Sequence, residues 1–242
     1  MTILFILIIS FIAALVRSTL GFGEALIAVP LFLFFLPADI AVPLSVMLSV
    51  VIALVIVIQD HKKIHFNSAK WLILYAIPGV PFGILLLTHG NETLVKTGLG
   101  VLIIAYSLYS LYFKNNKRLK EDNRFWLFTC GFLSGILGGA YGLNGPPLAV
   151  YGNLRRWNAK RFRATLQAYF LPVSLVSVLG YYAKGLVTSE VNAYFFISLI
   201  TTIPAIFLGR YFNHQLKGGA FFKYVYRGLI AVSLVLIINS LL

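Results

Sequence analysis

The sequence predicts an all-α membrane protein made of two inverted repeats, each with a short interrupted helical hairpin and three full transmembrane helices. The first observation is composition: of 242 residues, 60% are hydrophobic and 11% are charged, and the mean hydropathy is +0.89. A soluble domain with this composition lacks the polar residues to cover its outside, whereas a lipid bilayer is itself apolar. The other observations are the matching order of apolar runs in the two halves and the alternation of basic loops with loops poor in Lys and Arg.

Ten apolar runs follow one another through the chain and leave no room for a soluble domain. Several have about 17–21 residues, enough for a helix to cross the roughly 30 Å of hydrocarbon in a bilayer. The first two runs, and the sixth and seventh, are too short to do so alone. The runs are Ile3–Val16, Ala25–Leu36, Ile40–Ile58, Trp71–Leu87, Leu94–Phe113, Phe125–Leu137, Pro146–Leu154, Ala164–Tyr182, Val191–Leu208 and Phe222–Leu242.

The two pairs of short runs correspond to each other. Each pair is joined by a glycine-rich segment, TLGFGE in the first half and GGAYGLNGPP in the second. Sliding the chain against itself by 121 residues places Gly21 on Gly142, and later matches such as Pro78 with Pro204 keep the same order. This ordered similarity indicates an internal duplication. The predicted units are a first transmembrane repeat (1–113), a cytoplasmic connector (114–124) and a second transmembrane repeat (125–242).

Basic residues gather in alternate connections and predict the orientation. By the positive-inside rule the basic segments face the cytoplasm and both termini lie outside. Equivalent loops of the two halves then fall on opposite sides, so the repeats are inverted. The basic residues behind the formal charge of +13 are expected to contact lipid headgroups and not nucleic acid. The predicted location is the inner (plasma) membrane, as a multi-pass protein. Sixteen of the 20 Lys and Arg residues lie in His61–Lys70, Lys114–Arg124, Leu154–Arg163 and Arg210–Lys223.

The interrupted hairpins are the predicted location of the functional site. Short, broken segments in matching positions of inverted repeats are typical of secondary transporters, whose substrate sites lie near the bilayer midplane. Asn144 is a good N-cap and Pro146 suits a first helical turn, so a helix is expected to begin at about Gly145. Gly21 and Gly23 give the same access to backbone in the first half. Two helix N-termini that face each other would form an amide-lined pocket suited to an oxyanion.

Arg17 and Glu24 are the charged residues within the short pairs. An arginine at the centre of a bilayer costs about 2.5–3.5 kcal/mol, so Arg17 is expected to contribute charge to an anion site. Glu24 is the candidate carrier of a coupled proton, because a carboxylate is protonated more readily away from water. The alternative is a static ion pair that only stabilises the fold. The other candidate substrate-binding residues are Ser18, Thr19, Tyr141, Gly142 and Gln167.

Several other patterns indicate structural roles. His61 and His65 are spaced like two metal ligands on a helix, but no third ligand is near, so neither a metal nor another cofactor is expected. The single cysteine, Cys130, excludes a disulfide within the chain. The basic cluster from Arg155 to Arg163 is expected to fix the topology and, as a second use, to attract anions to a vestibule.

The hairpin motifs resemble those of the sulfite exporter TauE/SafE family. The likeness rests on GFGEALIAVPL and GGAYGLNGPPLAVY, on the segment from Pro37 to Pro43, and on the later IPGVPFG and IPAIFLG pieces. It covers nearly the whole chain. The resemblance implies a carrier of small organosulfur anions, such as sulfite and sulfoacetate, and of related carboxylates. Typical members have a glycine-rich run where this chain has Gly23 and Glu24.

Three hypotheses compete. The leading one is a secondary transporter that moves such an anion with the proton gradient or the membrane potential. The family resemblance implies an exporter, but no feature of the sequence separates import from export. The second is an intramembrane enzyme acting on a lipid phosphate, but the seven acidic residues are scattered and form no metal-binding motif. The third is a membrane assembly protein that does not transport. The expected partners are a small anion and the lipid bilayer, and a homodimer is left open.

The predicted orientation can be tested at Asn115 in the connector. An Asn115→Cys variant is expected to react with a membrane-impermeant thiol reagent only after the cytoplasmic face is opened, because the connector carries five Lys and Arg residues. Labelling of intact cells from outside would overturn the inverted arrangement.

Overall fold

All regular secondary structure in the described part of the chain is helical. The computed structural model describes residues 2–112, 119–215, 230, 233–235 and 237–238. Each predicted apolar run from Ile3 to Leu208 carries a helix or a pair of helices, which confirms the all-helical class; the last run and part of the connector, including Asn115, lie outside the described residues. The helices are α1 (Thr2–Leu20), α2 (Glu24–Phe32), α3 (Ala38–Asp60), the 3-10 turn η1 (His61–Lys63), α4 (Phe66–Ala76), α5 (Gly79–His89), α6 (Glu92–Tyr112), α7 (Arg124–Tyr141), α8 (Gly145–Leu154), α9 (Ala159–Ala183) and α10 (Ser189–Gln215).

The helices make this chain a multi-pass membrane protein. Among the described residues, α1, α3, α6, α9 and α10 are long and apolar enough to cross a bilayer. α4 and α5 form one further candidate, bent by 45° at their junction. The bend lies at Pro78, whose ring removes a backbone N–H and obstructs a continuous helix. Trp71–Leu87, predicted as one full transmembrane helix, is therefore a broken one.

Each interrupted hairpin pairs one long helix with one short helix. α1 and α7 have 19 and 18 residues, because the helix continues past the apolar run through Arg17 in one case and Gly138 in the other. α2 and α8 have nine and ten residues, or about 14 and 15 Å at 1.5 Å per residue. The prediction that all four segments are too short to span is thus wrong for α1, since Arg17 is buried and paired and does not end the helix.

Glycines with positive φ make the two hairpin turns. Gly21 and Gly23 have φ of 90° and 99°, and Gly142 has φ of 69°, a region that costs other residues steric strain. α8 begins at Gly145, as predicted. Asn144 occupies the N-cap position without a capping hydrogen bond from its side chain, contrary to the prediction. Its backbone carbonyl instead accepts a 2.6 Å hydrogen bond from the Ser134 hydroxyl.

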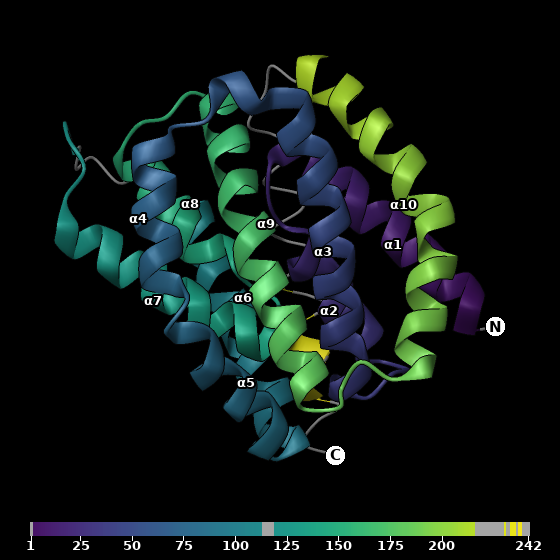
Figure 1. Cartoon of the computed structure of the whole chain (residues 1–242). Helices are drawn as coiled ribbons and strands as arrows, with labels where there is room; N and C mark the ends of the chain where they lie inside the picture. The colour runs from purple at the N-terminus through teal and green to yellow at the C-terminus, as the bar shows by residue number, and fades with distance from the viewer. Residues whose placement is uncertain (1, 113–118, 216–229, 231–232, 236, 239–242) are drawn as a thin grey trace.

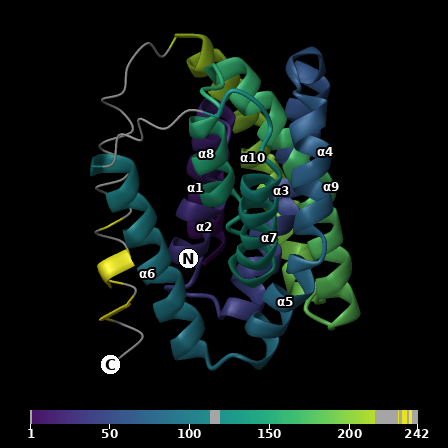
Figure 2. The ribbon, with the colours of Figure 1, turned by 90° about the vertical axis from the view of Figure 1, so that its left-hand side faces the viewer.

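The short helices lie inside the bundle. Figure 1 shows α9 in the middle, with α3, α1 and α10 on one side and α4, α7 and α8 on the other. Figure 2 shows α6 at one edge of the molecule. The ends of α3 and α8 and the starts of α4 and α9 lie together at the top of Figure 1. We call this the basic end, because the connections there carry Lys62, Lys63, Lys120, Arg155 and Arg156.

Close packing of α5 on α7 anchors the second hairpin. Gly83 of α5 lies so near to the carbonyl of Ile136 that an added Cβ would overlap it, and Gly135 of α7 is equally close to the carbonyl of Ala76. Small residues allow this approach between membrane helices, where packing provides much of the association energy. The glycines therefore fix the position of α7, from which α8 folds back.

Gly83→Ala is expected to destabilise the protein by about 1–3 kcal/mol, because the new methyl group forces α5 away from α7. Thermal unfolding of the purified protein in detergent measures the change as a lower midpoint. The matched control is Leu85→Met on the same helix, a substitution of similar volume at a side chain that is 43% exposed, which should leave the midpoint nearly unchanged. An unchanged midpoint in Gly83→Ala would show that this contact does not hold the helices together.

Candidate functional site

The two hairpin turns meet at a small buried cavity. Phe22, in the first turn, packs against Gly145 at the start of α8, and Gly142, in the second turn, lies against Ala25 of α2. The cavity has a volume of about 20 Å³, which is room for about one water molecule. The residues that line it are Arg17, Phe22, Gly23, Glu24, Ala25, Leu26, Ser49, Gly142, Leu143, Asn144, Gly145, Pro146 and Phe170.

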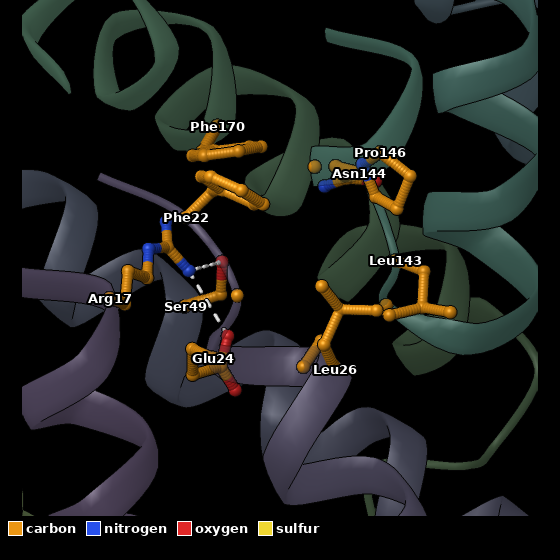
Figure 3. Close-up of a pocket in the computed structure, with 13 residues that line it drawn as sticks. Arg17, Phe22, Glu24, Leu26, Ser49, Leu143, Asn144, Pro146 and Phe170 are labelled. Atoms are coloured by element: carbon orange, nitrogen blue, oxygen red, sulfur yellow. Dashed lines mark hydrogen bonds and ion pairs between the residues drawn. The ribbon is translucent and has the colours of Figure 1, made fainter. Parts of the chain in front are cut away.

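Arg17 is the positive charge at this cavity. Its side chain is 4% exposed, and its Nη1 donates to Glu24 Oε2 at 3.1 Å and to Ser49 Oγ at 2.5 Å. The guanidinium carbon lies 4.6 Å from the centre of the Phe170 ring, a cation–π distance. Figure 3 shows Arg17, Ser49 and Glu24 together on one side of the cavity, with Leu26 and Leu143 opposite. The charged and hydroxyl side chains therefore share one wall, whereas the other wall has two leucines together with Asn144.

Gln167 of α9 fixes the other edge of the guanidinium. Its Oε1 accepts hydrogen bonds from Arg17 Nη2 at 3.0 Å and from Arg17 Nε at 3.2 Å. Its Nε2 donates to the carbonyl of Gly21 at 2.7 Å. One amide side chain thus connects the arginine, the first hairpin turn and α9. A hydrogen bond to a charged group typically contributes about 1.5–3 kcal/mol, so this connection is a substantial one.

Glu24 begins α2 and lies beside Arg17, with its Oε2 bound to the guanidinium. Its second oxygen, Oε1, accepts a 2.5 Å hydrogen bond from Ser45 of α3. Ser49, one turn further along α3, is 3.1 Å from Ser174 of α9. The carboxylate is 3% exposed and neutralises the arginine inside the protein. A buried pair held by further hydrogen bonds avoids most of the cost of an isolated charge.

The structure brings six of the predicted site residues to the cavity wall. The other five lie nearby with different contacts. Ser18 and Thr19 face α10, where an added Cβ on Gly209 would meet Ser18 and where Thr19 donates to the Gly209 carbonyl. The Tyr141 hydroxyl lies against Gly98 of α6. Gly21 and Gln167 support Arg17 from behind the wall. The six residues on the wall are Arg17, Gly23, Glu24, Gly142, Asn144 and Gly145.

Sequence reasoning missed three residues that contact the charged pair. Ser45 and Ser49 are four residues apart, which places both hydroxyls on one face of α3. Phe170 follows Gln167 by three residues on α9, so the same spacing brings its ring to Arg17. The signal was present as helical periodicity, but nothing in it identified Arg17 as the common partner.

Asp122 organises the basic end outside the membrane-spanning helices. It accepts hydrogen bonds from Ser68 and Tyr151, both at 2.7 Å, and pairs with Arg155 at 3.2 Å. Burial raises the pKa of Asp122, but these hydrogen bonds and the arginine outweigh burial and leave the pKa below its ordinary value. His65 caps α4 by accepting from the Ser68 N–H. No group of three His, Cys, Asp or Glu residues within the described part of the chain is arranged to hold a metal ion.

Comparison with known proteins identifies a family. The model of the family described as sulfite exporter TauE/SafE matches residues 6–237, nearly the whole chain. This match confirms the resemblance that the glycine-rich motifs predict. Comparisons with curated proteins and with solved structures find no match.

Gln167→Leu is expected to destabilise the protein by about 1–3 kcal/mol, because it leaves two arginine donors and the Gly21 carbonyl without a partner inside the protein. The midpoint of thermal unfolding in detergent reports the loss. The control is Ser177→Ala on the same helix, whose hydroxyl donates only to the Val173 carbonyl of its own helix and should change the midpoint little. Equal midpoints for the two variants would contradict the bracing role of Gln167.

Proposed function

Because the chain belongs to the sulfite exporter TauE/SafE family, a family of membrane transporters, we propose that it is a secondary transporter of small organosulfur or carboxylate anions such as sulfite or sulfoacetate. The observation that carries the proposal is a buried arginine at the meeting point of two interrupted hairpins. Arg17 has donors aimed at a cavity that both hairpin turns line. An arginine placed so deep in a membrane protein is costly unless its charge is used.

The inverted arrangement is part of this proposal. α1–α2 and α7–α8 are both a long helix followed by a short one, with glycines of positive φ at the turn. α8 ends at the basic end, whereas α2 leads away from it to the start of α3. In this arrangement the connector faces the cytoplasm, both termini face outward, and the two repeats enclose the site. Two hairpins that enter from opposite faces suit alternating access.

Glu24 provides the gating step in this proposal. In the structure its carboxylate forms an ion pair with Arg17, and the cavity is too small for an organic anion. An incoming anion binds Arg17 only when Glu24 moves away or takes up a proton. A proton on Glu24 removes the internal competitor and gives the anion the full charge of Arg17. Substrate binding and protonation are then coupled at one arginine.

The polar and apolar walls favour an anion with a small organic part. Arg17 and Ser49 offer donors to a sulfonate or carboxylate, whereas Leu26, Leu143 and Phe170 offer carbon contacts. The membrane potential, negative inside, supplies about 2.3 kcal/mol per charge per 100 mV for the exit of an anion that crosses alone. We therefore propose that the membrane potential drives export of the anion. Protonation and deprotonation of Glu24 control when the anion binds to Arg17 and when it leaves.

Counterflow of labelled sulfite and sulfoacetate in proteoliposomes tests the proposal. Arg17→Gln is expected to reduce counterflow at least about tenfold, since the anion loses its charged partner. Glu24→Gln is expected to be well expressed and to exchange substrate, because glutamine stays neutral and leaves Arg17 free. Its rate should no longer respond to an imposed pH gradient.

Glu190→Gln is the matched control, because Glu190 is an exposed carboxylate at the start of α10 that bonds only to Tyr194. Native-like counterflow in Arg17→Gln would remove the anion site from this cavity. A poorly folded Glu24→Gln protein, or one that keeps its full response to pH, would favour the static ion pair.

A further inference from the structure

A second buried arginine lies toward the basic end, on the same helix as Gln167. Arg163 of α9 has a side chain that is 2% exposed, and its Nη1 donates to Asp60 Oδ2 at 2.5 Å. Asp60 is the last residue of α3, and its other oxygen accepts from Lys63 at 2.7 Å. Arg163 and Asp60 therefore resemble Arg17 and Glu24, because in both pairs a buried arginine is bound to a carboxylate of the same chain.

One edge of the Arg163 guanidinium has no partner. Its Nε and Nη2 are buried and make no hydrogen bond to any described residue. These two N–H groups point in parallel from one side of the planar fork, the edge that binds two oxygens of a carboxylate or sulfonate at once. In Arg17 the same edge is taken by Gln167. Buried charged donors without partners are rare in native proteins, and this edge is free to bind a ligand.

The charge around Arg163 also favours an anion. Arg210 of α10 acts electrostatically on both Arg163 and Asp60, and Lys63 pairs with the same carboxylate. Three cations therefore surround a single carboxylate. Next to Lys63 opens a groove of about 330 Å³ on the surface of the basic end. Its lining has four cationic side chains and no acidic one: Lys62, Lys63, Ile64, His65, Asn158, Lys160 and Arg161.

Arg163 stands next to the first hairpin turn. An added Cβ on Gly21 would lie 2.9 Å from the Cα of Arg163, so the turn and α9 are in direct contact. Gln167 follows Arg163 by one helical turn, about 6 Å along the axis, and binds Arg17 directly. An anion on Arg163 is therefore one helical turn from the group that holds Arg17.

We propose that the open edge of Arg163, formed by Nε and Nη2, is a second oxyanion-binding site near the basic groove that takes a sulfite, sulfonate or carboxylate group, while Asp60 stays bound to Nη1. The idea that this site passes the anion on from the groove to Arg17 rests on the proposed transport function. The binding of an anion to Arg163 does not depend on that function. Asp60 weakens the site by its charge, as Glu24 does at Arg17. A stepwise path then runs from groove to Arg163 to Arg17, with an internal carboxylate at each arginine.

Isothermal titration of the purified full chain with sulfite, methanesulfonate and acetate, at constant ionic strength in detergent, tests the site. Arg163→Lys keeps the charge that pairs with Asp60 but lacks the planar edge, and is expected to weaken binding about tenfold. Asp60→Asn removes the neighbouring negative charge that repels an anion and is expected to tighten binding about tenfold. Arg17→Gln should retain both effects, which separates this site from the cavity.

Arg124→Gln is the control for charge alone, because this arginine is exposed at the start of α7 and does not line the groove. Its affinity should equal that of the native chain. Unchanged binding in both Arg163→Lys and Asp60→Asn, or no binding of any of the three anions to the native chain, overturns the site. If the native chain shows no counterflow but still binds the anions in a way that depends on Arg163, the transport proposal is wrong and the Arg163 site remains.

Discussion

The need to compensate the charge of Arg17 inside a membrane protein is the constraint on which the rest of the site depends. Its guanidinium receives a partner from each of three other helices: Glu24 from α2, Ser49 from α3 and Gln167 from α9. These contacts require α2 to begin close to the end of α1, which only a tight glycine turn permits. The short helix, the broken hairpin and the serines of α3 follow from one buried charge. Since water is scarce at this depth, each missing partner would leave a costly unsatisfied donor.

Helix α9 takes part in the surroundings of both buried arginines. Arg163 and Gln167 lie one turn apart on α9, and Gly21 contacts both the backbone of Arg163 and the amide of Gln167. The first hairpin turn is thus held between the cavity and the basic end. A displacement of this turn moves the surroundings of both arginines together. Coupling over such a distance needs only rigid contacts between packed elements, and this helix face provides them.

Local signals in the sequence predicted much of the fold and only part of the site. Apolar runs indicated the helices, and Gly21 and Gly142 indicated the turns, because both depend on neighbouring residues. An ion pair between Arg17 and Glu24 was one of the two predicted alternatives, and the two residues are only seven apart in the chain. Partners distant in the chain did not follow: Gln167 is 150 residues from Arg17, and Asp60 is 103 residues from Arg163. Such contacts depend on how the helices pack. The bend at Pro78 was visible as a proline, but its effect depends on whether neighbouring helices hold a straight span or a broken one.

Under the proposed transport function, the small size of the cavity indicates which parts must move for an anion to pass. Room for about one water molecule excludes an organic anion, so the walls have to separate. The long helices α1 and α7 are tied to α10 and α5 by close contacts, including Thr19 with Gly209 and Gly83 with α7. α2 and α8 are short, begin just after the glycine turns, and contribute Glu24 and Gly145 to opposite walls. Moving a nine-residue helix breaks fewer contacts than moving a whole span, and positive-φ glycines adopt new dihedral angles at little cost. The short arms are therefore the natural moving parts, and the departure of α2 would carry Glu24 away from Arg17 in the same motion that opens the site.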